Sequence, residues 1–200
     1  MDHVFVSASQ NVKKLLAYLN IEDDLITSSS VLGVNHEAHR VILNHYFDRA
    51  CAWAAGNADP APWVRFDMGQ EVTVWGVVAK PRCDYPSQQV SSLQVFKSDD
   101  GVNWCTASGV ITTDYSVDDT STTWFNEAWT ARYWRIDPVT WLNHPSMKAD
   151  LIGLPKGKAC SSCCCFCFCF VGIIYRRELM LNLKNKQTNL NIPPASLFPK

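Results

Sequence analysis

The chain has 200 residues, of which 47% are hydrophobic and 12% aromatic, so it is long enough for one domain with a sizeable core plus additional segments. Its formal net charge of −1 conceals an asymmetry, because residues 1–155 carry 11 basic and 18 acidic side chains whereas residues 156–200 carry 7 and 1. An acidic main domain is repelled by phosphate backbones, which disfavours nucleic acid as a partner.

The segment before residue 26 contains one helical pattern. Apolar residues at positions 12, 15, 16 and 19 follow the i, i+3, i+4, i+7 spacing, which predicts a short amphipathic helix over residues 11–20 within an N-terminal extension, residues 1–25. The first 30 residues lack a basic start that leads into an apolar run and a small-residue cleavage site. The chain as given therefore shows no secretory signal peptide.

Residues 26–153 have the pattern of an all-β sandwich. Segments rich in β-branched and aromatic residues are separated by Gly, Pro, Asn and Asp. These segments are 63–69, 72–79, 90–97, 103–111, 122–125 and 131–137. Asp100-Gly101 predicts a tight hairpin turn, Gly69 predicts a turn that excludes bulkier residues, and Pro138, which has no N–H, is expected to end the last strand.

Large aromatic residues and cysteines supply candidate core positions. The tryptophans expected in the core are Trp53, Trp63, Trp75, Trp104, Trp134 and Trp141. The domain holds three cysteines, Cys51, Cys83 and Cys105, so at most one internal disulfide can form there. We interpret all three as small buried thiols.

The composition changes abruptly in residues 154–200. A run of cysteines and phenylalanines, residues 160–170, continues into an apolar stretch and then into a basic, Asn-rich end. The 16 residues from Cys160 to Tyr175 are fewer than the roughly 20 that a membrane-spanning helix needs. We interpret the tail as a low-complexity segment without packed structure, ahead of a palmitoylated anchor and of a zinc site.

Six short motifs in one order resemble the discoidin family, also called the coagulation factor V/VIII type C domain. They are Ile26-Thr27-Ser28-Ser29-Ser30; Asn35-His36 with Arg40, Leu43-Asn44 and Ala52-Trp53; Trp63 to Gly69; Ser98 to Trp104; Ala131 to Pro138; and Trp141 with Met147 to Gly153. The resemblance implies an eight-stranded antiparallel jelly-roll β-sandwich of the galactose-binding-like type. Leu154 stands where the family usually has a closing cysteine, and no cysteine precedes residue 26.

In the family that this chain resembles, three loops at one end of the sandwich bind the ligand. Here these loops would be residues 31–40, 81–88 and 112–123. A sugar site needs groups that give paired hydrogen bonds to adjacent hydroxyls, together with an aromatic face. The candidate ligand-binding residues are Asn35, His36, Arg40, Arg82, Asp84, Tyr85 and Trp124. For Arg40, a structural role, like that of Arg132 and Arg135, competes with this interpretation.

The resemblance implies a non-catalytic binding module that recognises cell-surface or matrix glycans of the galactose type in cell adhesion, outside the cell or on its surface. The alternative is a module that binds phospholipid headgroups or protein through the same loops. Val31, Leu32 and Val34 could insert into a bilayer, but the acidic third loop disfavours anionic lipid.

Neither catalysis nor a tightly bound metal finds support in the motifs. The chain has no G-x-S-x-G elbow, phosphate-binding loop or dinucleotide-binding glycine motif. His36-Glu37-Ala38-His39 lacks the i, i+4 spacing that aims two imidazoles at one zinc ion. We expect no cofactor; calcium, bound by Asp114, Asp118 and Asp119, is the candidate ion within residues 26–153.

Overall fold

The computed structural model describes residues 17–19, 21–43, 51–115 and 120–155, most of which lie in antiparallel β-strands. The predicted all-β, jelly-roll fold class is confirmed. The strands are β1 (Ala17–Tyr18), β2 (Ile26–Ser28), β3 (Trp53–Ala54), β4 (Val64–Lys80), β5 (Gln89–Ser98), β6 (Cys105–Thr106), β7 (Ile111–Thr112), β8 (Ser121–Leu142) and β9 (Ser146–Pro155). Two 3₁₀ turns, η1 (Asp23–Leu25) and η2 (Ala38–Val41), complete this part of the chain.

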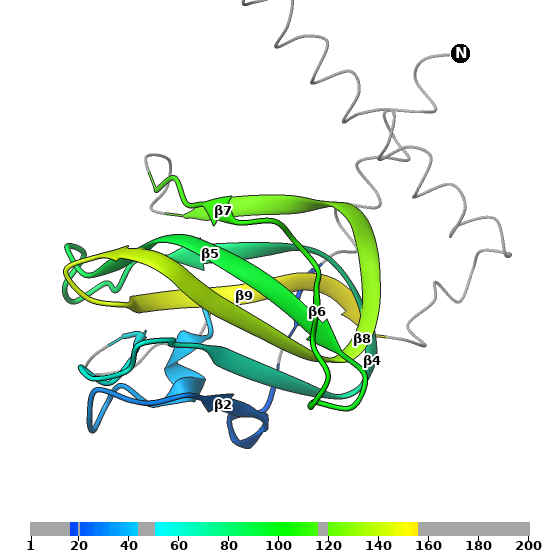
Figure 1. The fold of residues 1–200 in the computed structure, drawn as a ribbon, viewed down its shortest axis with the longest axis horizontal. Helices are drawn as coiled ribbons and strands as arrows, with labels where there is room; N and C mark the ends of the chain where they lie inside the picture. Colours follow the sequence, from blue (N-terminus) through cyan, green and yellow to red (C-terminus); the bar gives the residue numbers. More distant parts are fainter. Residues whose placement is uncertain (1–16, 20, 44–50, 116–119, 156–200) are drawn as a thin grey trace, which may run out of the picture. The chain divides into compact units, whose positions relative to one another are not determined.

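Two long strands, β4 and β8, take part in both layers of the sandwich. The first part of β8 pairs with β4 from Ser121↔Ala79 to Ala131↔Val72, and its last part pairs with β5. Figure 1 shows β8 bending sharply between these two parts. The register of β4 and β8 breaks around Gly69, whose φ of 66° fits the predicted turn. The sandwich is therefore built from shared bent strands rather than from two separate sheets.

The core lies between the two layers and is filled by alternate residues of the long strands. Its largest fully buried side chains include Trp53, Trp134 and Phe66. Trp63, Trp75 and Trp104 are partly buried, so they fit the predicted core less completely. The prediction for Trp141 is wrong, because 38% of this residue is exposed near the end of β8, where the last four residues of the strand, 139–142, are all exposed.

The structure corrects the predicted N-terminal helix where it describes it. Ala17 and Tyr18 form strand β1, which pairs with Gly153 and Ile152 of β9, while residues 11–16 and 20 lie outside the described part. Pairing with an exposed strand edge overrides the local helical periodicity, which is a weak preference in a short segment. The sheet thus begins before the predicted boundary at residue 26.

Pro138 does not end its strand, contrary to the prediction. It lies inside β8 opposite Leu93, next to a register shift between Ser92 and Leu93. A bulge tolerates a residue that has no N–H to donate. The predicted strand over residues 103–111 is likewise reduced to the two short strands β6 and β7, whereas the turn at Gly101 has the expected positive φ of 73°.

Two of the three domain cysteines are not free thiols, which corrects our interpretation. Cys51 and Cys83 form a disulfide with their Cα atoms 5.9 Å apart, and Cys105 is free and exposed. The bridge closes a loop of 32 residues, for which chain entropy predicts about 3 to 4 kcal/mol of stabilisation. It therefore offsets the missing bridge between the ends of the domain.

The C-terminal prediction falls almost entirely outside the described residues. Leu154 and Pro155 extend β9, opposite Thr73 and Val72 of β4, beyond the predicted boundary at residue 153. Within the part of the chain that the structure describes, no helix is long and apolar enough to cross a bilayer.

Candidate functional site

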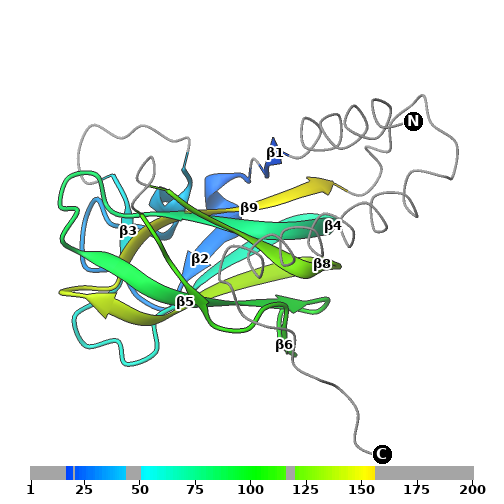
Figure 2. The same cartoon turned by 90° about the horizontal axis from the view of Figure 1, so that it is seen from above.

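Two turns meet at one end of the sandwich. The turns that join β4 to β5 and β8 to β9 lie at the same end in both orthogonal views (Figures 1 and 2). Asn143, with a φ of 58°, donates from Nδ2 to the carbonyl of Ser87 at 2.9 Å and so links these two turns. The disulfide between Cys51 and Cys83 ties the β4–β5 loop to the segment that enters β3. The scaffold thus fixes this loop at several points.

Arg82 organises the loop between β4 and β5. It is only 7% exposed; its Nε and Nη2 donate to Asp84 Oδ1 and Oδ2 at 2.9 and 2.6 Å, and Nη1 donates to Gln88 Oε1 at 2.9 Å. Hydrogen bonds from Arg82 lower the pKa of Asp84, although burial opposes this effect. Asp84 is therefore a carboxylate held in one orientation, and 36% of its side chain is exposed to a ligand.

Two histidines lie beside Arg82 with buried ring nitrogens that have no hydrogen-bond partner. These atoms are His36 Nδ1 and His144 Nε2; the other nitrogen of His144, Nδ1, lies 3.0 Å from Ser146 Oγ. Burial, and then the positive charge of Arg82, lower the pKa of both rings. Both imidazoles are therefore neutral at pH 7, and each leaves polar capacity unused.

In the first predicted loop, residues 31–40, some of the side chains expected to contact a ligand instead hold the loop in place. Asn35 adopts a φ of 72°, its backbone N–H donates to Glu37 Oε1 at 2.9 Å, and Arg40 donates to Glu37 Oε2 at 2.7 Å and to Asn35 Oδ1 at 3.3 Å. Hydrogen bonds to backbone amides are the largest cause that lowers the pKa of Glu37 to about 2. Asn35 and Arg40 thus stabilise the loop that carries His36.

Other predicted structural arginines also pair with acids. Arg132 binds both carboxylate oxygens of Asp67 at 2.8 and 2.9 Å, and Arg135 binds Asp137 in the same way. Their structural interpretation is confirmed.

The seven predicted ligand-binding residues do not form one group. Tyr85, which is 55% exposed, follows Asp84 in the loop that Arg82 organises, and His36 belongs to the same cluster. Trp124 instead lies within β8, where its ring is 3.3 Å from the position of a Cβ at Gly76, and it lines a different pocket. We refer to His36, Arg82, Asp84 and His144 as the loop cluster.

His144 was not among the predicted residues. Its signal in the sequence is the short Asn143-His144-Pro145 turn between two strands, which the fold brings to the same end as residues 81–88. A pattern of turns does not say which of them share an end until strand order is known.

The described residues hold one group of three potential metal ligands within 4.8 Å of one another, Cys51, Cys83 and Asp84. The two sulfur atoms are joined in the disulfide and offer no thiolate. Of the aspartates considered for calcium, Asp118 and Asp119 lie outside the described residues.

The F5/8 type C domain model matches residues 26–151. Lactadherin of Mus musculus is 30% identical over 108 residues, which are 51% of this chain and 23% of the mouse protein; lactadherin of Rattus norvegicus is 29% identical over the same length, 25% of that protein. The chain thus spans about a quarter of the length of these relatives.

Solved structures agree in fold. Discoidin II from Dictyostelium discoideum has a TM-score of 0.58 and 22% identity, over 72% of this chain and 57% of that chain. A Clostridium perfringens module solved in complex with GalNAc-β-1,3-galactose has a TM-score of 0.54 and 15% identity, over 63% and 92%. Because the family model covers more than half of the sequence, the chain belongs to the F5/8 type C domain family, whose members are generally non-catalytic binding modules.

Proposed function

We propose that the loop end of this domain binds a glycan without chemical turnover, as an adhesive module outside the cell. The observation that carries the proposal is the loop cluster, in which a buried arginine fixes an accessible carboxylate beside two neutral imidazoles. Fixed charged groups on a rigid scaffold are typical of binding loops.

The chemistry of the cluster suits sugar hydroxyls. The carboxylate of Asp84 can accept hydrogen bonds from two adjacent hydroxyls, and the hydrogen bonds of Arg82 to Asp84 and Gln88 use three of its five N–H donors. The exposed ring of Tyr85 can pack on the C–H face of a pyranose. A galactose-type ligand is supported by the Clostridium perfringens module, whose structure contains GalNAc-β-1,3-galactose.

The disulfide supports an extracellular location. Structural disulfides persist in oxidising compartments and are rare in the cytosol. The bridge between Cys51 and Cys83 closes onto the β4–β5 loop itself, so an oxidising environment would keep Arg82 and Asp84 in place.

Calorimetric titration with GalNAc-β-1,3-galactose, the disaccharide of that complex, tests the proposal. Tyr85→Ala should weaken binding about tenfold, because it removes an aromatic platform without removing any described hydrogen bond of its side chain. Tyr18→Ala, which removes an exposed tyrosine on β1, is the matched control and should bind like the wild type. Equal affinities for the wild type and Tyr85→Ala would refute the assignment of the site.

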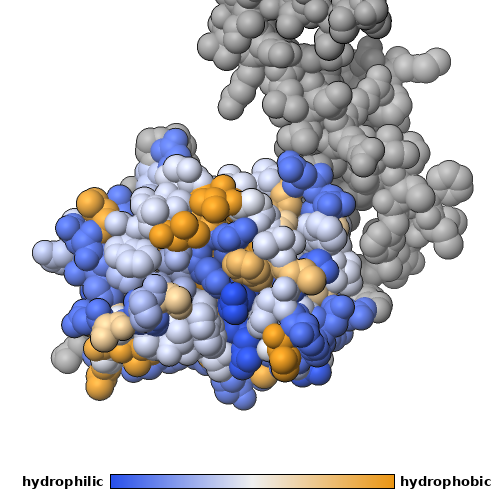
Figure 3. Space-filling view, viewed as in Figure 1, coloured by the Kyte–Doolittle hydropathy of each residue, from blue (hydrophilic) through white to orange (hydrophobic). Residues whose placement is uncertain are grey.

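A phospholipid surface is the second candidate, because the first loop exposes apolar side chains. Val34 is 84% exposed and Val31 is 44% exposed, and such tips can enter the acyl boundary of a bilayer. On the face drawn in Figure 3, hydrophobic residues form small separate patches among hydrophilic ones. Insertion would thus depend on loop tips, and Val34→Asp should abolish sedimentation with phosphatidylserine vesicles while leaving binding of the disaccharide unchanged.

A further inference from the structure

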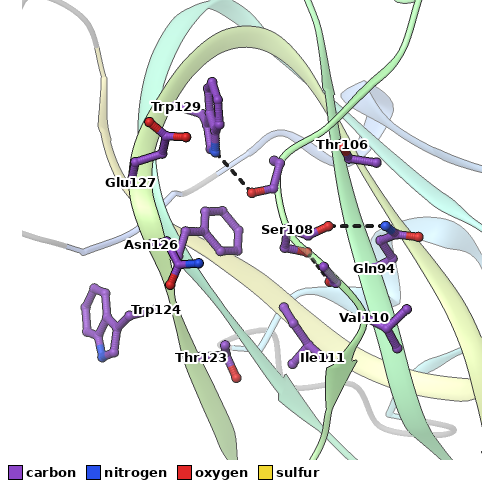
Figure 4. Close-up of a pocket in the computed structure, with 13 residues that line it drawn as sticks. Gln94, Thr106, Ser108, Val110, Ile111, Thr123, Trp124, Asn126, Glu127 and Trp129 are labelled. Carbon is purple, nitrogen blue, oxygen red and sulfur yellow. Dashed lines mark hydrogen bonds between the residues drawn. The ribbon is translucent and has the colours of Figure 1, made fainter. Parts of the chain in front are cut away.

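A pocket whose lining shares no residue with the loop cluster lies between two sheet edges. It has a volume of about 470 Å³, within the range of small-molecule sites. One wall is the first part of β8, and the other is the segment of residues 106–111, together with Gln94 of β5 (Figure 4).

The pocket exists because the two layers of the sandwich separate along this side. Within the described residues, Ser121–Ala131 of β8 pair with β4 alone, whereas β6 and β7 pair with β5. Two hydrogen bonds connect the edges, from Trp129 Nε1 to the carbonyl of Ala107 at 3.0 Å and from the N–H of Asp114 to Ser121 Oγ at 3.0 Å. The opening between these two points is the pocket.

The middle of β8 supplies the aromatic and charged groups of the pocket. Phe125 is buried and Trp129 is partly buried, and both line the pocket together with Thr123 and Glu127, in the stretch where the register between β8 and β4 shifts. At this edge the interior is open, which leaves Glu127 exposed beside the two aromatic residues. An aromatic surface therefore adjoins a hydroxyl group and a carboxylate.

The opposite wall is held in place by its own hydrogen bonds. Gln94 Nε2 donates to the carbonyl of Ser108 at 3.2 Å, and Ser108 Oγ accepts from the N–H of Val95 at 3.1 Å. The carbonyl oxygen of the Gln94 amide and the hydroxyl of Thr106 add further polar groups to the lining. A wall fixed before binding lowers the entropic cost of binding a ligand.

Charge narrows the class of ligand. Glu127 is the one charged residue in the lining. Lys97 is not part of the lining; its ammonium lies 5.0 Å from the ring centre of Trp129. A carboxylate among neutral amides and hydroxyls accepts hydrogen bonds from hydroxyl groups and repels acidic ligands.

From these features we propose that the edge pocket is a second binding site, and that it takes a neutral, hydroxyl-rich saccharide. Its residues are separate from the loop cluster, so the inference does not rest on the function proposed for the loops. A domain with two separate sites can bridge two glycan chains or gain avidity on one branched glycan.

The test is nuclear magnetic resonance titration of the ¹⁵N-labelled protein with lactose, cellobiose and N,N′-diacetylchitobiose, each to about 10 mM, which is tenfold above a Kd of about 1 mM. The indole N–H of Trp129 and the side-chain amide of Gln94 report directly on the two walls. We expect saturable shifts of both signals with at least one of the three sugars, and the same shifts in Tyr85→Ala.

Glu127→Ala should raise the Kd of that sugar about tenfold, because it removes charge-assisted hydrogen bonds. Glu22→Ala, an exposed glutamate beside η1, is the matched control and should leave the Kd unchanged. If lactose is the ligand, 3′-sialyllactose should bind more weakly, because its carboxylate faces Glu127.

The proposal is overturned if none of the three sugars shifts either signal, or if Glu127→Ala binds as well as Glu22→Ala. Loss of the shifts in Tyr85→Ala would also overturn it, because the shifts would then come from the loop cluster. If the wild type shows the shifts at Trp129 but binds GalNAc-β-1,3-galactose no better than Tyr85→Ala does, the proposed loop function is refuted and the edge pocket stands.

Discussion

Asp150 provides a test of how burial sets the stability of this domain. It lies in β9 opposite Val78, it is 1% exposed, and its Oδ1 accepts the N–H of Leu151 at 2.8 Å. Burial raises its pKa from 3.8 to about 7, although backbone hydrogen bonds oppose the shift. Within the described part of the chain, no ion pair joins it to a basic side chain.

Linkage between proton binding and folding gives the direction of the pH effect on stability. Because the pKa of Asp150 is higher in the folded state than in the unfolded state, its contribution to stability is fully present below pH 3.8 and is lost as the pH rises through about 7. The shift of about three pKa units, at about 1.4 kcal/mol each, gives a loss of about 4 kcal/mol by pH 8. Asp150→Asn keeps an acceptor oxygen but cannot ionise, so it should escape this loss.

Urea unfolding of the wild type and Asp150→Asn at several values between pH 4 and 8 measures the effect. The variant should be about as stable as the wild type near pH 4 and more stable by about 4 kcal/mol at pH 8. Asp67→Asn is the contrasting control: Arg132 lowers the pKa of Asp67, so this variant should lose stability above pH 4. A difference between Asp150→Asn and the wild type that is equal at pH 4 and pH 8 would refute the reasoning.

Three further predictions concern the disulfide, a close backbone approach and a buried imidazole. Replacing Cys51 and Cys83 by Ser should lower the free energy of unfolding by about 3 to 4 kcal/mol under non-reducing conditions, measured by urea unfolding. Gly76→Ala places a Cβ 2.6 Å from the carbonyl oxygen of Thr123 and should lower the free energy of unfolding by about 2 kcal/mol, measured by thermal denaturation. In the control variant Gly109→Ala the new Cβ meets no atom within 4 Å, so the free energy of unfolding should change by less than about 0.5 kcal/mol. The pKa of His144 is lowered from 6.5, so the wild type should lose stability relative to His144→Gln as the pH falls below 6.5; a pH-independent difference would contradict this.

The family, the β class and most strand positions could be predicted from the sequence. Alternating apolar residues in segments such as Trp63 to Gly69 and Ala131 to Pro138 indicate strands with one buried face, and this local pattern does not depend on partners. The errors concern segments whose state depends on a distant neighbour. Ala17 and Tyr18 follow a helical pattern but pair with β9, and Pro138 is accommodated by a bulge against β5.

The candidate site was also predictable only in part, because it depends on residues that are distant in the sequence. His36, Arg82, Asp84 and Tyr85 stand in loops that motif order assigns to one end of the sandwich, and the structure groups the first three by charge and hydrogen bonding. Trp124 resembles Tyr85 in residue type, yet it lies on strand β8 and lines the edge pocket.

Strand alternation, turn positions and family motifs can be recognised in the sequence alone, because these properties depend on neighbours a few positions away. It takes the folded chain to show that Cys51 bonds Cys83, that His144 lies beside Arg82 and that a pocket stays open between β8 and the 106–111 segment. Each of these features joins groups far apart in the chain, and their distance is set by strand register and by the bend of β4 and β8.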